Sequence, residues 1–302
     1  MLNPREPDWA QVARALGKVL AVTVVLYLAL GAADRVLWLF LPSGDERMAQ
    51  VHGTAARVAN PDKRVSHGFD SGERLLQSAY TIWAEPRLAG YSEPERYEIV
   101  ETLFGTIHAP NLDGPSGNLG NAISAVETGP DEGEKETARK TIDALPQTLV
   151  ATAVVEFTHP MSAEQLIAFN RRHILRGGPD VSYIYSPPSL YDDSDPSPPR
   201  NAVVWNRNMI EENTWEEFTY EHETEPGTAL REFRNWVGLL NEGDDLSEFG
   251  LDYQWLALAA EEGAVYGLVM DRWKLADLRA LLPDEDVKTI RLADVTFDLD
   301  LG

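Results

Sequence analysis

The sequence predicts an α+β protein with a single membrane-crossing helix near its N-terminus. Three observations support this: one uncharged apolar run, a strongly acidic remainder, and two strand–helix–strand patterns in the second half of the chain. With 302 residues, 43% of them hydrophobic, the chain can bury the core of one or two domains. The predicted parts are a tail (1–15), a membrane helix with an interfacial extension (16–41), a membrane-proximal region (42–133) and an α+β domain (134–302).

The charge of the chain is strongly negative and unevenly distributed. The net charge is −23, which argues against direct nucleic-acid binding because phosphate contacts require clustered Lys and Arg. The chain has no cysteine, which excludes disulfides, thiol catalysis and thiolate metal sites. Residues 1–18 carry a net charge of +1, and the residues after 42 carry −24. This asymmetry predicts a single-pass protein of the cell membrane, with a cytoplasmic N-terminus and the acidic domain outside.

The predicted crossing is the uncharged run over residues 19–33, which becomes 18 residues long when it is counted from Leu16. Roughly 17–25 apolar residues span the hydrocarbon core of a bilayer. Lys18 can extend toward the headgroups, and Trp38 suits an interfacial position. Two alternatives remain open: a secretory signal peptide cut at Ala32, and the buried core helix of a soluble protein.

The region that follows the crossing has weak periodicity. Its richness in Gly, Pro, Asn and Asp predicts a loop over 109–133, and Pro146 ends a predicted helix over 135–145. Three further segments are ambiguous between helix and strand: 51–58, 75–83 and 97–104.

The first strand–helix–strand pattern begins with the β-branched apolar run 149–157, which predicts a buried strand. Ser162 and Gln165 form a capping box that begins a helix running to about residue 173. A second strand is predicted over 181–185. A long proline-rich break follows at 186–200, and after it we expect a short strand at 202–205 and helices over 228–241 and 251–262, the latter ended by Gly263.

The second pattern repeats this order near the C-terminus. A strand over 264–270 precedes a helix over 272–282 that Asp271 is expected to cap, and a strand over 287–292 follows. Each crossover should be right-handed and place two parallel strands side by side. Two such units in one sheet, with their helices on one side, predict a ferredoxin-like sandwich.

Motifs that would carry catalysis are absent from the sequence. None of the six histidines has the spacing of a helical zinc site, and neither a nucleophile elbow nor a phosphate-binding glycine loop occurs. Asp192, Asp193 and Asp195 resemble the start of a calcium loop, but the prolines after them break the pattern. We therefore expect no enzyme activity and no catalytic, cofactor-binding or metal-binding residues. The alternative is a hydrolase with a dispersed site that uses His159 or His222.

The layout of the chain resembles the sigma factor regulator family, membrane-bound proteins related to anti-sigma factors of Gram-positive bacteria. The resemblance covers the chain in outline and is most specific over the final third. The segments that carry it are 138–146, which leads into the strand at 149–157, then 253–263, 265–269, 272–282 and 287–295, with Asn60-Pro61 as a looser match.

This resemblance implies a regulator whose outer domain senses a condition or partner while its inner tail restrains a sigma factor or binds a second membrane regulator. The tail offers one apolar face for such docking, formed by Trp9, Val12, Ala13 and Leu16 at helical spacing. The plainer interpretation is that these residues are the inner end of the membrane helix. The alternative function is an envelope structural or assembly factor that docks on another protein and has no role in transcription.

Overall fold

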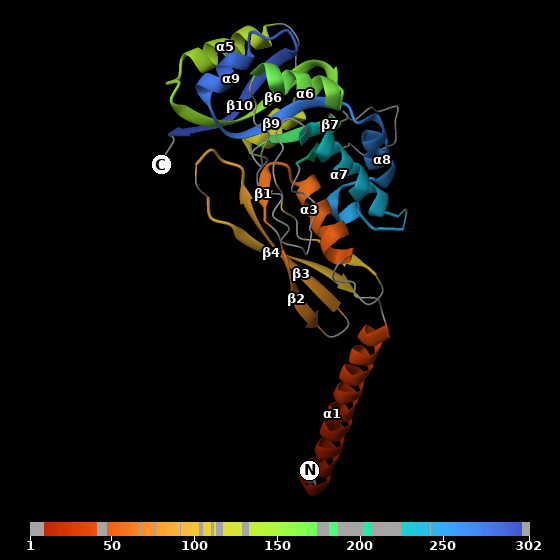
Figure 1. The fold of residues 1–302 in the computed structure, drawn as a ribbon. Coiled ribbons are helices and arrows are strands. Elements are labelled where there is room, and N and C mark those ends of the chain that lie inside the picture. The colour runs from red at the N-terminus through yellow and green to blue at the C-terminus, as the bar shows by residue number, and fades with distance from the viewer. Residues whose placement is uncertain are drawn as a thin grey trace, which may run out of the picture.

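The computed structural model describes residues 9–40, 47–66, 68–74, 77–90, 92–102, 105–109, 112, 117–128, 133–173, 181–186, 202–206, 225–241 and 243–297. It is an α+β structure with an N-terminal apolar helix and two antiparallel sheets (Figure 1). The first sheet lies between the N-terminal helix and the second sheet in this view. The predicted proline-rich break beyond residue 186, with its three aspartates, and the segment around His222 lie outside the described residues.

The N-terminal helix α1 runs without interruption from Trp9 to Phe40. Its segment Trp9–Ala33 is long and apolar enough to cross a membrane, and none of its most apolar stretch is buried in the protein. This confirms the predicted apolar helix and removes the interpretation as a core helix. A signal sequence near an N-terminus shares the same length and composition, so both of these interpretations fit α1.

Two short helical segments follow α1 in the chain. The π-helical turn η1 (Met48–Gly53) continues into α3 (Thr54–Ala59), and nearly every residue of the two is buried. The absence of a side chain at Gly53 matters for this packing, because a Cβ there would lie 2.9 Å from Cε1 of Tyr80. Residues 51–58, which were ambiguous in the sequence, are therefore helical.

The first sheet is built on β3 (Gln77–Pro86), which pairs with β4 (Glu95–Thr102), and β4 pairs with β5 (Ile107–His108). On its other edge β3 pairs with both β1 (Lys63–Val65) and β2 (Phe69–Arg74), which act as one interrupted strand. Alternate residues Tyr80, Ile82 and Ala84 of β3 are buried, as expected for a strand with one covered face. The segments that were ambiguous at 75–83 and 97–104 are therefore largely strand.

The second sheet has the strand order β10-β6-β9-β7-β8, and every pair of neighbours is antiparallel. Its strands are β6 (Leu149–Met161), β7 (Val181–Ser186), β8 (Val203–Trp205), β9 (Val265–Lys274) and β10 (Val287–Phe297). The prediction that each unit pairs two parallel strands directly is wrong. The strands β6 and β7 do run in the same direction, but β9 lies between them, and β6 likewise separates β9 from β10.

The helices of the second half cover the two faces of this sheet unequally. One face, with Ala151, Ala153 and Val155 of β6, packs against a large helical layer. That layer consists of α5 (Glu134–Asp143), α6 (Ala163–His173), α7 (Glu225–Leu239), α8 (Tyr253–Glu262) and α9 (Leu275–Leu281). The opposite face carries Val154 and Val269 and packs against α4 (Asn118–Ser124), which the predicted loop over 109–133 did not include.

Local signals in the sequence located several helix ends correctly. The capping box is present: the Gln165 N–H donates to Ser162 Oγ at 3.3 Å, and the Ser162 N–H donates to Gln165 Oε1 at 2.8 Å. The helix α8 ends at Gly263, whose φ of 60° is the left-handed conformation that favours glycine. The expected cap at Asp271 is wrong, because β9 continues through Asp271 to Lys274 and α9 begins only at Leu275.

Candidate functional site: the junction between the two sheets

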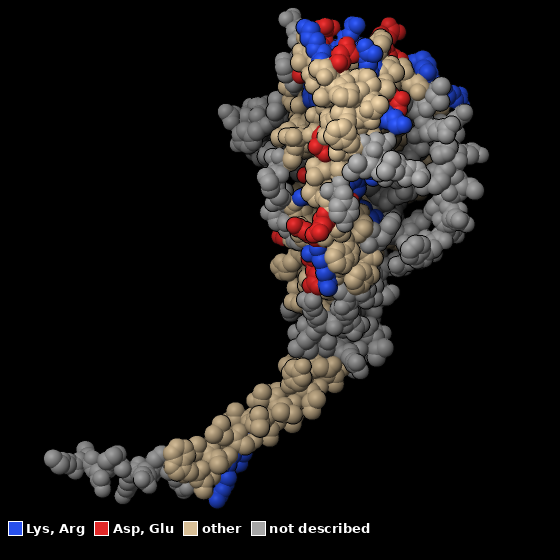
Figure 2. Space-filling view, turned by 90° about the vertical axis from the view of Figure 1, so that its left-hand side faces the viewer, with Lys and Arg blue, Asp and Glu red and all other residues tan. Residues whose placement is uncertain are grey.

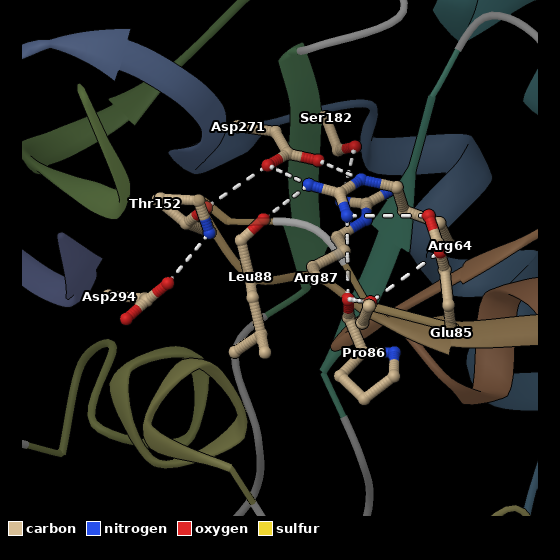
Figure 3. Close-up of polar contacts among 11 residues, drawn as sticks. Arg64, Glu85, Pro86, Arg87, Leu88, Thr152, Ser182, Asp271 and Asp294 are labelled. Carbon is tan, nitrogen blue, oxygen red and sulfur yellow. Dashed lines mark hydrogen bonds and ion pairs between the residues drawn. The ribbon is translucent and has the colours of Figure 1, made fainter. Parts of the chain in front are cut away.

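The two sheets are joined by an ion pair between Arg64 of β1 and Asp271 of β9 (Figure 3). Arg64 Nε donates to Asp271 Oδ2 at 2.9 Å, and Arg64 Nη2 donates to Asp271 Oδ1 at 2.8 Å. Thr152 Oγ1 of β6 also donates to Asp271 Oδ1, at 3.0 Å. The Asp271 carboxylate is buried, with 8% of its side chain exposed, so this two-point contact compensates its desolvation.

A bulge in β9 places Asp271 in this position. Ala151 pairs with Trp273 and Ala153 pairs with Met270, so Asp271 and Arg272 lie opposite Thr152 alone. Arg272 accommodates the extra residue with a φ of 59°. The bulge therefore presents Asp271 to the first sheet, on the face of the second sheet that carries Thr152.

Arg64 also organises the segment that follows β3. Its Nη2 donates to the carbonyl of Leu88 at 2.6 Å, and its Nη1 lies 3.4 Å from Glu85 Oε1. Burial alone would lower the pKa of Arg64, but the hydrogen bond and charge of Asp271 outweigh it and raise that pKa above its ordinary value. The Arg64 guanidinium therefore stays charged at neutral pH.

Residues 87–89 make two further polar links across the junction. Arg87 Nη1 donates to Ser182 Oγ of β7 at 3.1 Å, and the Ala89 N–H donates to Asp294 Oδ2 of β10 at 2.8 Å (Figure 3). Beside these links lies a cavity of about 440 Å³ that is lined by both sheets and by α4. Its charged lining has both signs, with Asp62, Glu95 and Asp294 facing Lys63 and Arg87.

A second set of contacts ties the segment that follows α1 directly to the C-terminal half. Arg47 Nη2 contacts both carboxylate oxygens of Asp244, at 2.6 and 2.7 Å. Trp236 Nε1 of α7 donates to the carbonyl of Gln50 at 3.0 Å. The ring of His52 stacks on Phe249 of η2 (Ser247–Phe249), with 6.1 Å between centroids and 19° between planes. We call these contacts, formed by residues 47–52 with 236–249, the α1-proximal clamp.

His52 is a buried imidazole within this clamp. It is 6% exposed, and its Nδ1 has no hydrogen-bond partner among the described residues. Burial lowers the pKa of His52 to about 4, although the nearby carboxylates of Asp244 and Asp245 oppose this shift. The imidazole is therefore neutral in the folded protein over most of the pH range in which an exposed histidine titrates.

This burial predicts a pH-dependent stability. Below pH 6.5 the unfolded chain binds a proton at His52 that the folded chain does not bind until about pH 4, so stability falls as the pH falls through this window. The loss attributable to His52 is roughly 3 kcal/mol, at about 1.4 kcal/mol per pKa unit. Urea unfolding of the detergent-solubilised chain at pH 7, 5.5 and 4.5 measures it.

The matched variants are His52→Phe, which keeps a ring against Phe249, and His159→Gln, which removes an exposed imidazole. His52→Phe should flatten the decline in stability, and His159→Gln should leave it unchanged. A decline of equal size in all three proteins would assign the pH dependence to other groups.

The Arg64–Asp271 pair gives a second prediction. Asp271→Ala should lower the free energy of unfolding by about 2–3 kcal/mol, because Arg64 then loses two charge-assisted hydrogen bonds in a partly buried site. A double-mutant cycle with Arg64→Ala should give a coupling above about 1 kcal/mol. Glu85→Ala removes a 3.4 Å contact with Arg64 between half-buried side chains and a 3.5 Å hydrogen bond from Ser92 Oγ, and it should change stability by less than about 1 kcal/mol. Additive effects of Arg64→Ala and Asp271→Ala would contradict the pairing.

The residues singled out in the sequence lie elsewhere. Trp9, Val12, Ala13 and Leu16 are all exposed on α1, and His159 is exposed near the end of β6. Within the described ranges, no group of three His, Asp or Glu side chains could hold a metal ion. Arg64, Asp271 and His52, which form the contacts between the two halves, were not singled out from the sequence. The available signal for Asp271 was its place at the end of an apolar strand, which was taken instead for a helix cap.

Comparison of the chain with protein-family models, with curated proteins and with solved structures gives no match in any of the three. The class of protein therefore rests on the fold and on the contacts described above.

Proposed function

We propose that this protein is a single-pass membrane regulator, with a cytoplasmic N-terminus and an extracytoplasmic body that binds a protein partner. The observation that carries the proposal is α1, a helix that is apolar, exposed and attached to a folded body with its own core. An exposed apolar surface of this length is unstable in water and is covered when the helix lies in lipid. Two basic residues of α1, Arg14 and Lys18, lie toward its N-terminal end, as expected for a cytoplasmic end, whereas Asp34 and Arg35 near its other end add no net charge (Figure 2).

The α1-proximal clamp supports a regulatory role for this arrangement. Only six residues separate Phe40 from Arg47, and Arg47 and His52 contact the C-terminal half through Asp244 and Phe249. A partner that shifts the C-terminal half would therefore move the segment next to the membrane helix. Transmission of a signal between the partner-binding half and the membrane helix requires an element whose position depends on both.

We also infer a ferredoxin-like arrangement for the second sheet. The order β10-β6-β9-β7 with antiparallel neighbours, and a helix connecting β6 to β7 and β9 to β10, support this assignment. In it, β8 is an added edge strand, and α7 and α8 are inserted before β9. Sheets of this kind serve many functions, so the assignment does not itself select one.

The partner that we propose for the cytoplasmic tail is a sigma factor or a second membrane regulator, on the strength of the resemblance to sigma factor regulators. The docking face is Trp9, Val12, Ala13 and Leu16, which α1 presents as one exposed helical surface. The alternative is an envelope assembly factor in which the body alone docks on another protein. The junction and the clamp are compatible with either function, because a regulator and an assembly factor each need a rigid body on a membrane anchor.

The deciding experiment is crosslinking and pull-down from membranes with the full chain and with a Trp9→Ser/Val12→Ser variant. This variant keeps Arg14 and Lys18, so the charges that orient α1 are unchanged. Gln11→Ser on the same helix is the control. Loss of a sigma factor or membrane regulator only in the double variant would support the regulator. Recovery of envelope proteins alone, equal for all three chains, would favour the assembly factor.

A further inference from the structure

A groove of about 640 Å³ lies between α5 and α9, on the helical layer at the end of the body far from α1 (Figure 1). Its floor is apolar and is formed by small side chains. Ala276 and Ala280 are exposed one turn apart on α9, and Leu282 and Pro283 also line the groove. Two alanines in place of larger side chains leave space between the helices at this point.

The rim of the groove carries more positive than negative charge. Lys135 Nζ donates to the carbonyls of Asp284 and Val287, at 2.6 and 2.8 Å, and contacts no carboxylate in the described part of the chain. Arg279 and Arg139 share the single carboxylate of Asp143, at 2.5 and 3.8 Å. The lining therefore contains three cations and one carboxylate, Glu136, while Asp143 beside the groove pairs with the two arginines.

The acid in the lining, Glu136, does not cancel this excess. Glu136 lies 3.9 Å from Lys140, and the two side chains are 58% and 76% exposed, so they form a solvated pair beside the groove. A positive groove is notable in a chain whose net charge is −23. Figure 2 shows the same end of the molecule, where Lys and Arg side chains lie among the acidic ones.

We propose that this groove binds an acidic amphipathic helix of a protein partner. Lys135 and Arg139 are four residues apart on α5, a rise of about 6 Å, which matches carboxylates one turn apart on a bound helix. A small anion could satisfy the cations but would gain nothing from the alanine floor, whereas small apolar side chains between the carboxylates would cover it. This inference goes beyond the proposed function and does not require α1 to cross a membrane.

The test uses the full chain in neutral detergent and a fluorescent helical peptide with Glu at every fourth position and a face of Ala and Leu. Fluorescence anisotropy measures binding. Arg139→Glu should weaken binding by about tenfold or more, as should Ala280→Trp, which fills the groove without changing its charge. Lys140→Glu makes the same charge change on the neighbouring residue, outside the lining, and should change affinity less than about twofold. All three positions are exposed, and circular dichroism checks folding.

Several results would overturn the inference. They are an absence of peptide binding, an equal loss in Arg139→Glu and Lys140→Glu, or equal binding of a peptide with Lys in place of Glu. Displacement of the peptide by millimolar inorganic phosphate would reassign the groove to a small anion. Self-association of the chain that Ala280→Trp abolishes would reassign it to a second copy. None of these outcomes depends on the tail, so failure here is distinguishable from failure of the proposed function.

Discussion

Replacing Glu156 by alanine is expected to lower the free energy of unfolding by about 3–5 kcal/mol, because two cations would lose their buried carboxylate. Glu156 lies in the middle of β6 and is 0% exposed. Its carboxylate contacts Arg291, lies 2.9 Å from Lys288 Nζ, and accepts the Glu127 N–H at 3.1 Å. Each contact compensates part of the cost of removing a carboxylate from water.

The prediction depends on the cations being unable to reach solvent. The side chains of Lys288 and Arg291 are only 19% and 16% exposed, because both lie on the partly covered face of β10. Arg291 keeps one other carboxylate, Glu134, at 2.7 Å. Glu134→Ala should therefore have a smaller effect than Glu156→Ala, since Arg291 would retain Glu156.

Urea unfolding of the solubilised chain measures these differences. A third variant tests whether the loss of stability comes from the unpaired cations or from removal of the Glu156 side chain itself. Glu156→Leu combined with Lys288→Met and Arg291→Met removes the charges together and should recover most of the stability that Glu156→Ala loses. A loss below about 1 kcal/mol in Glu156→Ala would mean that Lys288 and Arg291 move to solvent on their own. In that case Glu156 would not be the centre of the cluster.

The sequence predicted the strands whose two faces are apolar, because a β-branched apolar run has few other stable environments. The apolar run 149–157 lies within β6 and residues 265–270 of the second run lie within β9, while the strand predicted over 287–292, which carries Lys288 and Arg291 on one face, lies within β10. Helix ends that depend on one or two neighbouring residues, such as the capping box at Ser162 and the glycine at 263, were also predictable. These features depend on neighbouring residues only, so the spacing of residues in the sequence is enough to predict them.

Features that depend on distant partners were not predictable in the same way. Glu156 sits inside an apolar run, and its partner Arg291 is 135 residues away. Asp271 resembled a helix cap because a polar residue after a strand usually begins a helix, but its partner Arg64 lies 207 residues earlier in the chain. The predicted direct pairing of parallel strands was wrong for the same reason, since pairing across the sheet is decided by long-range packing rather than by the pattern within each strand.

The residues of the candidate junction were difficult to predict for the same reason. Arg64 lies in a three-residue strand with no apolar pattern, so nothing local distinguishes it from an exposed arginine. His52 lies in a helical segment that was ambiguous in the sequence, and its ring stacks on Phe249, which lies far away in the chain. Residues that join separately encoded units therefore carry the weakest sequence signal, although they hold the two halves of the body together.

The second large effect is expected in α1. Val22→Arg/Leu26→Arg places two charges in the middle of the uncharged run 19–33 and should abolish stable membrane integration. On insertion scales, each arginine near the centre of a membrane helix costs about 2.5–3.5 kcal/mol. The run of 15 residues is only about 22 Å long as a helix, which is shorter than a hydrocarbon core of about 30 Å. The apolar run is therefore too short to compensate for two further charges in its middle.

Carbonate extraction of membranes, followed by detection of the body in the pellet, measures this effect. Val22 and Leu26 are each 58% exposed, so their replacement removes no contact from the folded body. Gln11→Arg/Ala15→Arg has the same charge and spacing but lies outside the run beside Arg14, and it should remain integrated. Mass determination of the mature N-terminus distinguishes the signal-sequence alternative, because cleavage before residue 33 would release the body from α1. An intact N-terminus in the carbonate-resistant pellet would support the anchor, since a helix this exposed has no other surface in the described protein to cover it.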